Sequence, residues 1–260
     1  MRIPFYRVNA FTDRAFGGNP AGVCPLQTWL PDATLQRIAN ENNLSETAFL
    51  VRAGDDYELR WFTPAIEVDL CGHATLASAF VLFTELGRDG ARIRFHTRSG
   101  WLAAALCEDL IELDFPAWRP TPCSAPEEFV RGLGRPPREV LKSRDFVAVY
   151  ESQTAVAAIN PDMGLLTKLD CLGVIVTSQG DDSDFVSRFF APKAGVPEDP
   201  VTGSAHSSLI PFWAERLHKE EMFARQISQR GGELYCKLLG ERVAIAGRAV
   251  IYCRGELEIP

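Results

Sequence analysis

The second half of this 260-residue chain repeats landmarks of the first half in the same order. Each landmark is a short segment with glycine, proline or charge, and the offset between copies drifts only from 126 (54 to 180) to 132 (98 to 230). The four pairs are Gly54-Asp55-Asp56 with Gly180-Asp181-Asp182, Phe62-Thr63-Pro64 with Phe190-Ala191-Pro192, Gly72 with Gly203, and Arg98-Ser99-Gly100 with Arg230-Gly231-Gly232. Because this period exceeds that of solenoid repeats, the pattern predicts two similar domains rather than an array.

Hydrophobic patterns within each half predict short strands around one buried helix. The segments 73–86 and 204–217 are apolar nearly all round, which is typical of a helix enclosed in the middle of its domain. A further helix is expected over residues 31–43, where Pro and Asp stand at the start. Strand-like runs, separated by Gly, Asp and Ser, lie at residues 48–51, 59–62, 93–97, 101–106 and 110–115.

These elements predict an α+β fold of two similar lobes, each an antiparallel, barrel-like sheet wrapped around a central helix. We expect the first lobe over residues 1–116, completed by a C-terminal strand at about 249–260, and the second lobe over residues 117–248. Four prolines between positions 116 and 126 mark the crossing from one lobe to the other.

Charge and hydropathy exclude several classes of protein. The formal net charge is −7 and the arginines are spread, so the surface offers no basic track for a nucleic-acid backbone. No stretch approaches the roughly 20 uninterrupted apolar residues of a membrane helix. Residues 1–10 lack the charged-then-apolar pattern of a secretory leader. We therefore expect a cytoplasmic protein that binds neither nucleic acid nor a membrane.

The cysteines and histidines do not follow metal or disulfide spacings. The seven cysteines are scattered with no C-x-x-C pair, and the four histidines show no H-E-x-x-H spacing. Cys71 with His73 is a thin basis for a metal site on its own. We expect neither a disulfide framework nor a metal cofactor.

Both buried helices begin with glycine followed by small or polar residues, Gly72-His73-Ala74-Thr75 and Gly203-Ser204-Ala205-His206. The first N–H groups of a helix lack intrahelical partners and carry partial positive charge, so such an end prefers an anion. Either glycine alone would indicate only a tight turn. If the two halves face one another, however, the paired helix starts would converge on a cleft suited to a small carboxylate-bearing molecule.

Three acidic residues are candidates for proton transfer. Asp69 and Asp199 come just before the two buried helices, where capping is the commonest role of such residues. Glu46 follows the first helix and precedes an apolar strand, a position usually occupied by a solvated loop residue. The repeat places Leu172 opposite Glu46, so the two halves are chemically unequal. This asymmetry favours one principal acid/base rather than a matched pair.

Five motifs, in order along nearly the whole chain, carry a family resemblance. They are residues 11–22 (FTDRAFGGNPAG), 43–49 (NLSETAF), 60–64 (RWFTP), 69–75 (DLCGHAT) and 198–204 (EDPVTGS). Together they resemble the phenazine-biosynthesis-like (PhzF) isomerase family, whose fold is similar to that of diaminopimelate epimerase. The resemblance implies two lobes with the active site between them, and a homodimer.

The resemblance also implies the chemistry and its residues. A cofactor-independent isomerase would move a proton between carbons of a small carboxylate-bearing substrate, without metal or organic cofactor. Glu46 would be the general acid/base. The residues that would assist it at the substrate are His73, Asp199 and Ser204, and those that would bind the substrate are Asn19, Gly72, Thr202 and Gly203.

Other functions remain open from the sequence. The nearest alternative is a racemase or epimerase with two opposed thiols, for which Cys71 has the right position but its repeat counterpart Thr202 cannot form a thiolate. A non-catalytic interaction protein that keeps the fold is a second alternative. A nucleotide-binding dehydrogenase is a distant third, because no G-x-G-x-x-G segment opens a helix after a strand. Activity of a Cys71→Ser variant distinguishes the two-thiol racemase from the isomerase. Activity of a Glu46→Gln variant distinguishes the non-catalytic interaction protein from the isomerase.

Overall fold

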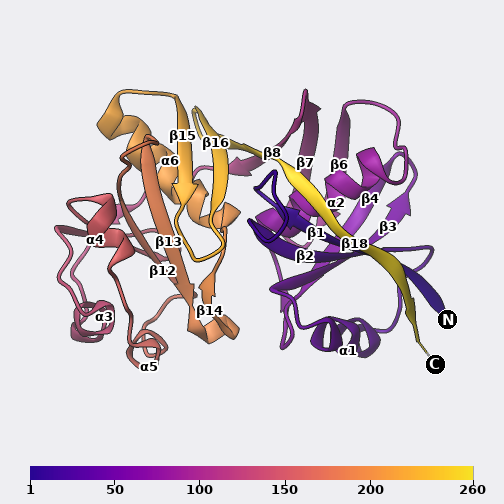
Figure 1. The fold of residues 1–260 in the computed structure, drawn as a ribbon, viewed down its shortest axis with the longest axis horizontal. Helices are drawn as coiled ribbons and strands as arrows, with labels where there is room; N and C mark the ends of the chain where they lie inside the picture. The colour runs from indigo at the N-terminus through magenta and orange to yellow at the C-terminus, as the bar shows by residue number, and fades with distance from the viewer. Residues whose placement is uncertain (260) are drawn as a thin grey trace. The chain divides into compact units, whose positions relative to one another are not determined.

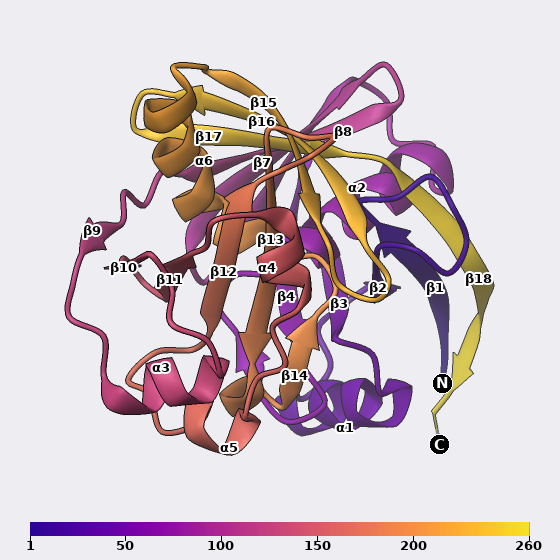
Figure 2. The same cartoon turned by 60° about the vertical axis from the view of Figure 1, so that its left-hand side comes forward.

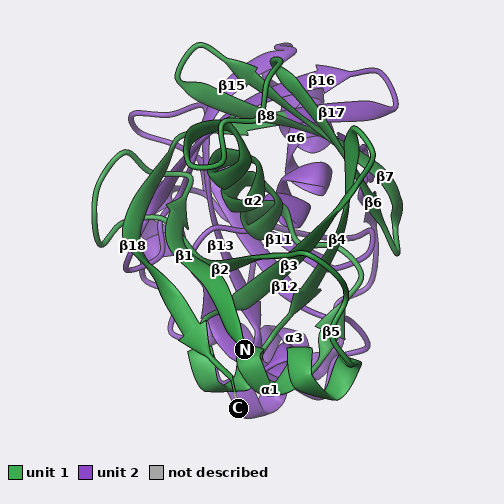
Figure 3. Cartoon of the chain, turned by 90° about the vertical axis from the view of Figure 1, so that its right-hand side faces the viewer, with its two compact units in different colours: residues 1–114, 245–260 green, residues 115–244 purple. Residues whose placement is uncertain are grey.

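The computed structural model describes residues 1–259, and the chain divides into two compact units. Unit 1 comprises Met1–Asp114 with Ile245–Pro260, and unit 2 comprises Phe115–Ala244 (Figure 3). Among the described residues, no helix is long and apolar enough to cross a membrane.

Unit 1 is built from strands that surround one long buried helix (Figure 1). Its strands are β1 (Arg2–Ala10), β2 (Asn19–Leu26), β3 (Glu46–Ala53), β4 (Asp56–Phe62), β5 (Glu67–Val68), β6 (Arg92–Thr97), β7 (Gly100–Cys107), β8 (Leu110–Pro116, which ends in unit 2) and β18 (Ala249–Glu258). Its helices are α1 (Asp32–Asn42) and α2 (Gly72–Thr84). Helix α2 packs on β1, β2, β3 and β7.

Unit 2 has the same plan with more short elements (Figure 2). Its strands are β9 (Thr121–Pro122), β10 (Glu139–Lys142), β11 (Phe146–Val149), β12 (Val174–Gln179), β13 (Phe185–Ala191), β14 (Val196–Asp199), β15 (Glu221–Gln226), β16 (Gly232–Leu239) and β17 (Arg242–Gly247, which ends in unit 1). Its helices are α3 (Glu127–Leu133), α4 (Gln153–Ala157), α5 (Met163–Leu166), the 3-10 turn η1 (Pro192–Ala194) and α6 (Gly203–Leu217). Helix α6 packs on β15 and β16.

Strand pairing confirms the duplication that the sequence landmarks predict. In unit 1, β2 pairs with β3 in parallel, β3 with β4 antiparallel, and β4 with β6 in parallel. In unit 2, β11, β12, β13 and β15 repeat this series of parallel, antiparallel and parallel pairs. The α+β architecture is therefore confirmed, with parallel as well as antiparallel strand pairs in each unit rather than antiparallel pairs alone. Each parallel pair requires a crossover, and helices α1, α2 and α6 lie in three of the connections.

The predicted central helices are present and buried. Every α2 residue from Gly72 to Ala79 is buried, so its hydroxyl groups must find partners inside the protein. Thr75 Oγ1 donates to the Cys71 carbonyl at 2.5 Å, and Ser78 Oγ donates to the Ala74 carbonyl at 2.7 Å. These bonds to the preceding turn let two polar side chains lie within an apolar core.

Helix α6 contains a proline, and the structure shows how its backbone is satisfied. Pro211 has no N–H group, so the carbonyl of Ser207 lacks its usual intrahelical donor. The Trp118 N–H donates to that carbonyl at 2.9 Å. The chain just after β8 therefore completes the hydrogen bonding of the buried helix.

Candidate active site

The candidate side chains of unit 1 lie at the first residues of two strands and one helix. Asn19 is the first residue of β2, Glu46 is the first residue of β3, and Gly72 begins α2. Strands β2 and β3 are parallel neighbours with Ala21 opposite Glu46, so both begin at the same end of the ladder. Helix α2 packs on both strands, which brings His73 of its first turn to this end.

Glu46 is not the solvated loop residue that its sequence position suggests. Its side chain is only 15 % exposed, and its Oε2 atom lies 3.1 Å from Nε2 of His73. Within the described residues, neither atom has a well-aligned hydrogen-bond partner, although both are buried. The two side chains therefore form a close, buried acid/base pair.

His73 connects Glu46 to two further residues. Its side chain is 3 % exposed, and its Nδ1 atom lies 3.0 Å from Nδ2 of Asn19 and 3.5 Å from Sγ of Cys71. Burial lowers the pKa of His73, but the negative groups beside the ring outweigh burial and raise that pKa well above 6.5. The imidazole therefore has Glu46 beside Nε2 and both Asn19 and Cys71 beside Nδ1.

Cys71 lies beside His73 as a neutral thiol. Burial, with a smaller contribution from the Glu46 charge, raises the pKa of Cys71 to about 11. A thiol with this pKa carries no charge near neutral pH. A Cys71 thiolate would raise the pKa of His73 more than Glu46 does. Because Cys71 is neutral near pH 7, we attribute the raised pKa of His73 at that pH to the Glu46 carboxylate.

The candidate residues of unit 2 form a separate polar network before α6. Thr202 Oγ1 donates to Oδ2 of Asp199 at 2.5 Å. The half-buried Ser204 and the buried Gly203 lie in the first turn of the helix. Thr202 occupies the N-cap position without bonding the helix through its side chain, because its hydroxyl is directed at Asp199. Thr202 therefore does not cap α6 through its side chain.

Gln226 holds this network together, and sequence reasoning missed it. Its Oε1 accepts from the Thr202 N–H at 2.8 Å. Its Nε2 donates to the Asp199 carbonyl at 2.7 Å and lies 3.2 Å from Thr202 Oγ1. The side chain is 1 % exposed and is the last residue of β15. A lone glutamine at a strand end carries no motif, so no sequence signal indicated this role.

His206 is a second residue that the sequence did not identify. Its Nδ1 donates to the Thr202 carbonyl at 2.8 Å, one turn back along α6. Burial lowers the pKa of His206 to about 4, which keeps the ring neutral near pH 7. His206 and His73 thus lie in the first turns of equivalent helices but have pKa shifts of opposite direction. The difference follows from Cys71 and Glu46, the two ionisable side chains that lie beside His73.

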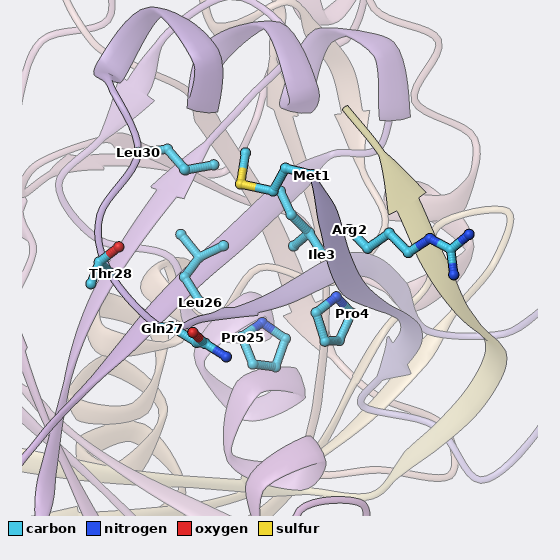
Figure 4. Close-up of a pocket in the computed structure, with 9 residues that line it drawn as sticks. All are labelled: Met1, Arg2, Ile3, Pro4, Pro25, Leu26, Gln27, Thr28 and Leu30. Carbon is cyan, nitrogen blue, oxygen red and sulfur yellow. The ribbon is translucent and has the colours of Figure 1, made fainter. Parts of the chain in front are cut away.

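The structure therefore brings Asn19, Glu46, Gly72 and His73 together in unit 1, and Asp199, Thr202, Gly203 and Ser204 together in unit 2. Asp69 is exposed between β5 and α2 and belongs to neither group. A pocket of about 410 Å³ in unit 1 is lined by residues 1–4, 25–28 and Leu30 (Figure 4). None of the candidate residues lines it, and its lining holds no carboxylate or imidazole side chain that could move a proton.

Comparison with known proteins decides the family. The sequence profile of the family described as phenazine biosynthesis-like protein matches residues 8–255. The chain belongs to this phenazine biosynthesis-like family. An uncharacterized isomerase of Pseudomonas aeruginosa is 51 % identical over 259 residues and covers 100 % of both chains. The predicted family resemblance is thereby confirmed.

Solved structures of a family member and of an epimerase have folds similar to that of this chain. The crystal structure of a phenazine biosynthesis protein of the PhzF family from Enterococcus faecalis has a TM-score of 0.96 and 47 % identity, with 100 % of both chains covered. A hydroxyproline epimerase from Agrobacterium vitis has a TM-score of 0.66 at 12 % identity, covering 98 % of this chain and 92 % of that one. The second likeness concerns the fold alone and confirms the predicted epimerase-like architecture.

Proposed function

We propose that this member of the phenazine biosynthesis-like family is an isomerase that moves a proton between carbons of a small carboxylate-bearing substrate. The observation that carries the proposal is the buried Glu46–His73 pair, with 3.1 Å between Oε2 and Nε2. A carboxylate that is sheltered from water and beside a single imidazole is well suited to general acid/base catalysis. The name of the Pseudomonas relative, an isomerase, supports the same reaction class.

In the proposed reaction, Glu46 carries the proton. Its carboxylate takes a proton from one carbon of the substrate and returns it to another, so the enzyme ends in its starting state. Protonated His73 offsets the negative charge that develops on the substrate while the proton is on Glu46. Asn19, at 3.0 Å from Nδ1, fixes the orientation of the imidazole. The scheme needs no redox partner because no electron leaves the substrate.

The helix starts supply the proposed binding groups for the substrate carboxylate. The proposed donors to this carboxylate are the backbone N–H groups in the first turns of α2 and α6, at Gly72 and Gly203. The absence of a Cβ at these two positions allows close approach of a ligand. Asp199, Thr202 and Ser204 are proposed to bind substrate, as the family resemblance implies. Their support is the ordered network that fixes Asp199 and Thr202, together with the family motif.

The proposal is tested by transfer of solvent deuterium. The purified protein is incubated in heavy water with a panel of cyclic dienoic acids and amino acids, and NMR detects deuterium entering a carbon position. On any substrate found, Glu46→Gln lowers the rate by about 10²–10⁴-fold, which is the usual contribution of a general acid/base. Glu41→Gln is the matched control, because Glu41 is exposed on α1.

Two outcomes would contradict the assignment. Turnover by Glu46→Gln at the wild-type rate would remove Glu46 from the chemistry. No deuterium incorporation across the whole panel would favour the non-catalytic alternative, in which the fold serves only an interaction.

We also propose that the protein works in the cytoplasm as a homodimer. Support for the location is that all seven cysteines are free, as in a reducing compartment. Support for the dimer is the family resemblance. Sedimentation equilibrium tests the oligomeric state, and a single species with the mass of one chain would contradict the dimer.

A further inference from the structure

We propose that two matching arginine–glutamate pairs, Arg60–Glu67 in unit 1 and Arg188–Glu198 in unit 2, are positioning residues that fix the starts of α2 and α6. The offsets between the copies are 128 (60 to 188) and 131 (67 to 198), which lie within the range of the other repeated landmarks. Both units therefore keep this pair of side chains, although Glu46 has no acidic counterpart in unit 2.

The pair of unit 1 is bidentate and largely buried. Nε of Arg60 donates to Oε1 of Glu67 at 2.7 Å, and Nη2 donates to Oε2 at 2.7 Å. The two side chains are 19 % and 11 % exposed, and the guanidinium lies 5.2 Å from the centre of the Phe62 ring. Oε2 of Glu67 also lies 2.7 Å from Nη2 of Arg98. Two parallel bonds between planar groups hold Arg60 and Glu67 in one relative geometry.

The pair of unit 2 repeats this arrangement. Nε of Arg188 donates to Oε1 of Glu198 at 2.7 Å, and Nη2 donates to Oε2 at 3.0 Å. The guanidinium lies 4.9 Å from the centre of the Phe190 ring, and Nη1 donates to the Ile159 carbonyl at 2.7 Å. In both units, therefore, the arginine binds a glutamate through two bonds and lies over the phenylalanine two positions later.

Each glutamate comes shortly before a helix of the candidate site. Glu67 lies five residues before Gly72, and Glu198 lies five residues before Gly203. The strands that carry the glutamates are short, because β5 has two residues and β14 has four. So short a strand makes few backbone hydrogen bonds, and the side-chain pair therefore adds to the attachment of the segment that enters each helix.

In unit 1 the contact connects the two members of the acid/base pair. Arg60 lies on β4, which pairs with β3, the strand that begins with Glu46. Glu67 lies on the segment that leads into α2 and to His73. We therefore expect the contact to maintain the 3.1 Å separation between Oε2 of Glu46 and Nε2 of His73. A displacement of about 1 Å at reacting groups costs about 10²-fold in rate.

In unit 2 the contact acts on the polar network before α6. Glu198 immediately precedes Asp199, whose Oδ2 accepts from Thr202 Oγ1 at 2.5 Å. Arg188 thereby fixes the chain on one side of this network. In both units the effect on catalysis rests on the proposed function, whereas the effect on the geometry of the helix starts does not.

Lysine substitution tests the pair of unit 1. Arg60→Lys keeps the charge but removes the planar fork, so the bidentate contact is lost. Nitrogen-15 NMR should show a lower pKa of His73 in the folded variant, because the Glu46 carboxylate acts less on a ring that lies farther away. On any substrate found, kcat should fall by up to about 10²-fold with a smaller change in KM.

Two further variants make this test specific. Arg94→Lys is the matched control, because Arg94 makes an exposed bidentate pair with Asp56 outside the segment before α2, and it should leave the His73 titration unchanged. Glu67→Asp guards against misfolding of Arg60→Lys: it keeps both charges but draws the carboxylate back by one methylene, and should lower the pKa of His73 in the same way.

Hydrogen exchange tests the pair of unit 2. In Arg188→Lys the Thr202 amide should exchange about tenfold faster or more, as expected for the loss of hydrogen bonds to a charged group. Arg216→Lys is the control, since Arg216 binds Glu139 through two bonds in the last turn of α6.

A purely structural role predicts different results. If Arg60→Lys and Glu67→Asp lower the free energy of unfolding but leave the His73 titration as in the wild type, the positioning role in unit 1 is overturned. Unchanged Thr202 exchange in Arg188→Lys overturns it in unit 2. A lowered pKa of His73 with unchanged kcat would support the positioning role and contradict the proposed function.

Discussion

Replacing Gln226 by methionine should loosen the segment that presents Asp199 and Thr202. Methionine has nearly the same shape but neither donates nor accepts the bonds that Gln226 makes to Thr202 N, Asp199 O and Thr202 Oγ1. A buried N–H group left without an acceptor costs about 1–3 kcal/mol, and each remaining bond contributes about 0.5–1.5 kcal/mol. We therefore expect the free energy of unfolding to fall by about 2–6 kcal/mol.

Urea denaturation of Gln226→Met measures this loss. The matched control is Gln179→Met, because Gln179 is exposed at the end of β12 and a surface change there should shift the free energy by no more than about 0.5 kcal/mol. Hydrogen exchange adds a local readout, since the Thr202 amide should exchange faster in the variant. A loss below about 1 kcal/mol with unchanged exchange at Thr202 would refute the holding role of Gln226.

Two further predictions concern Cys71 and His206. Cys71→Ser should retain deuterium transfer on any substrate found, because a thiol with a pKa of about 11 is not a base at neutral pH; complete loss of turnover would support the two-thiol alternative. His206 should titrate near pH 4 by NMR. Since its folded pKa lies below the unfolded value of about 6.5, the unfolded chain binds more protons between these values, and the free energy of unfolding falls by about 3 kcal/mol as pH drops from 6.5 to 4. A His206 resonance that titrates near 6.5 would contradict the burial argument.

The architecture was accessible from the sequence because it depends on repeated and periodic features. The landmarks spaced 126 to 132 residues apart correspond to the repeated strand pairs of the two units. The two apolar segments correspond to α2 and α6, and the helix expected over 31–43 is α1. Parallel pairing was not predicted, because a short strand gives no sequence sign of the direction of its neighbour.

The candidate site was only partly accessible. Gly72 was visible because a buried helix start has unsatisfied N–H groups whatever the rest of the fold, whereas Glu46 and His73 were assigned only from the family resemblance. The direct contact between Glu46 and His73 was not predicted, since it depends on β3 beginning at Glu46 and on the packing of α2 against that strand. Gln226 was missed for a similar reason: its partners lie 24 to 27 residues away and meet it only through folding.

The most direct test of the central claim, that Glu46 and His73 act as one acid/base pair, needs no substrate. Nitrogen-15 NMR follows the titration of the His73 ring in wild-type protein, in Glu46→Gln and in Glu41→Gln. We predict a pKa well above 6.5 in the wild type and in Glu41→Gln, and a pKa below 6.5 in Glu46→Gln, where burial acts without the carboxylate. The same titration in all three proteins would contradict the account.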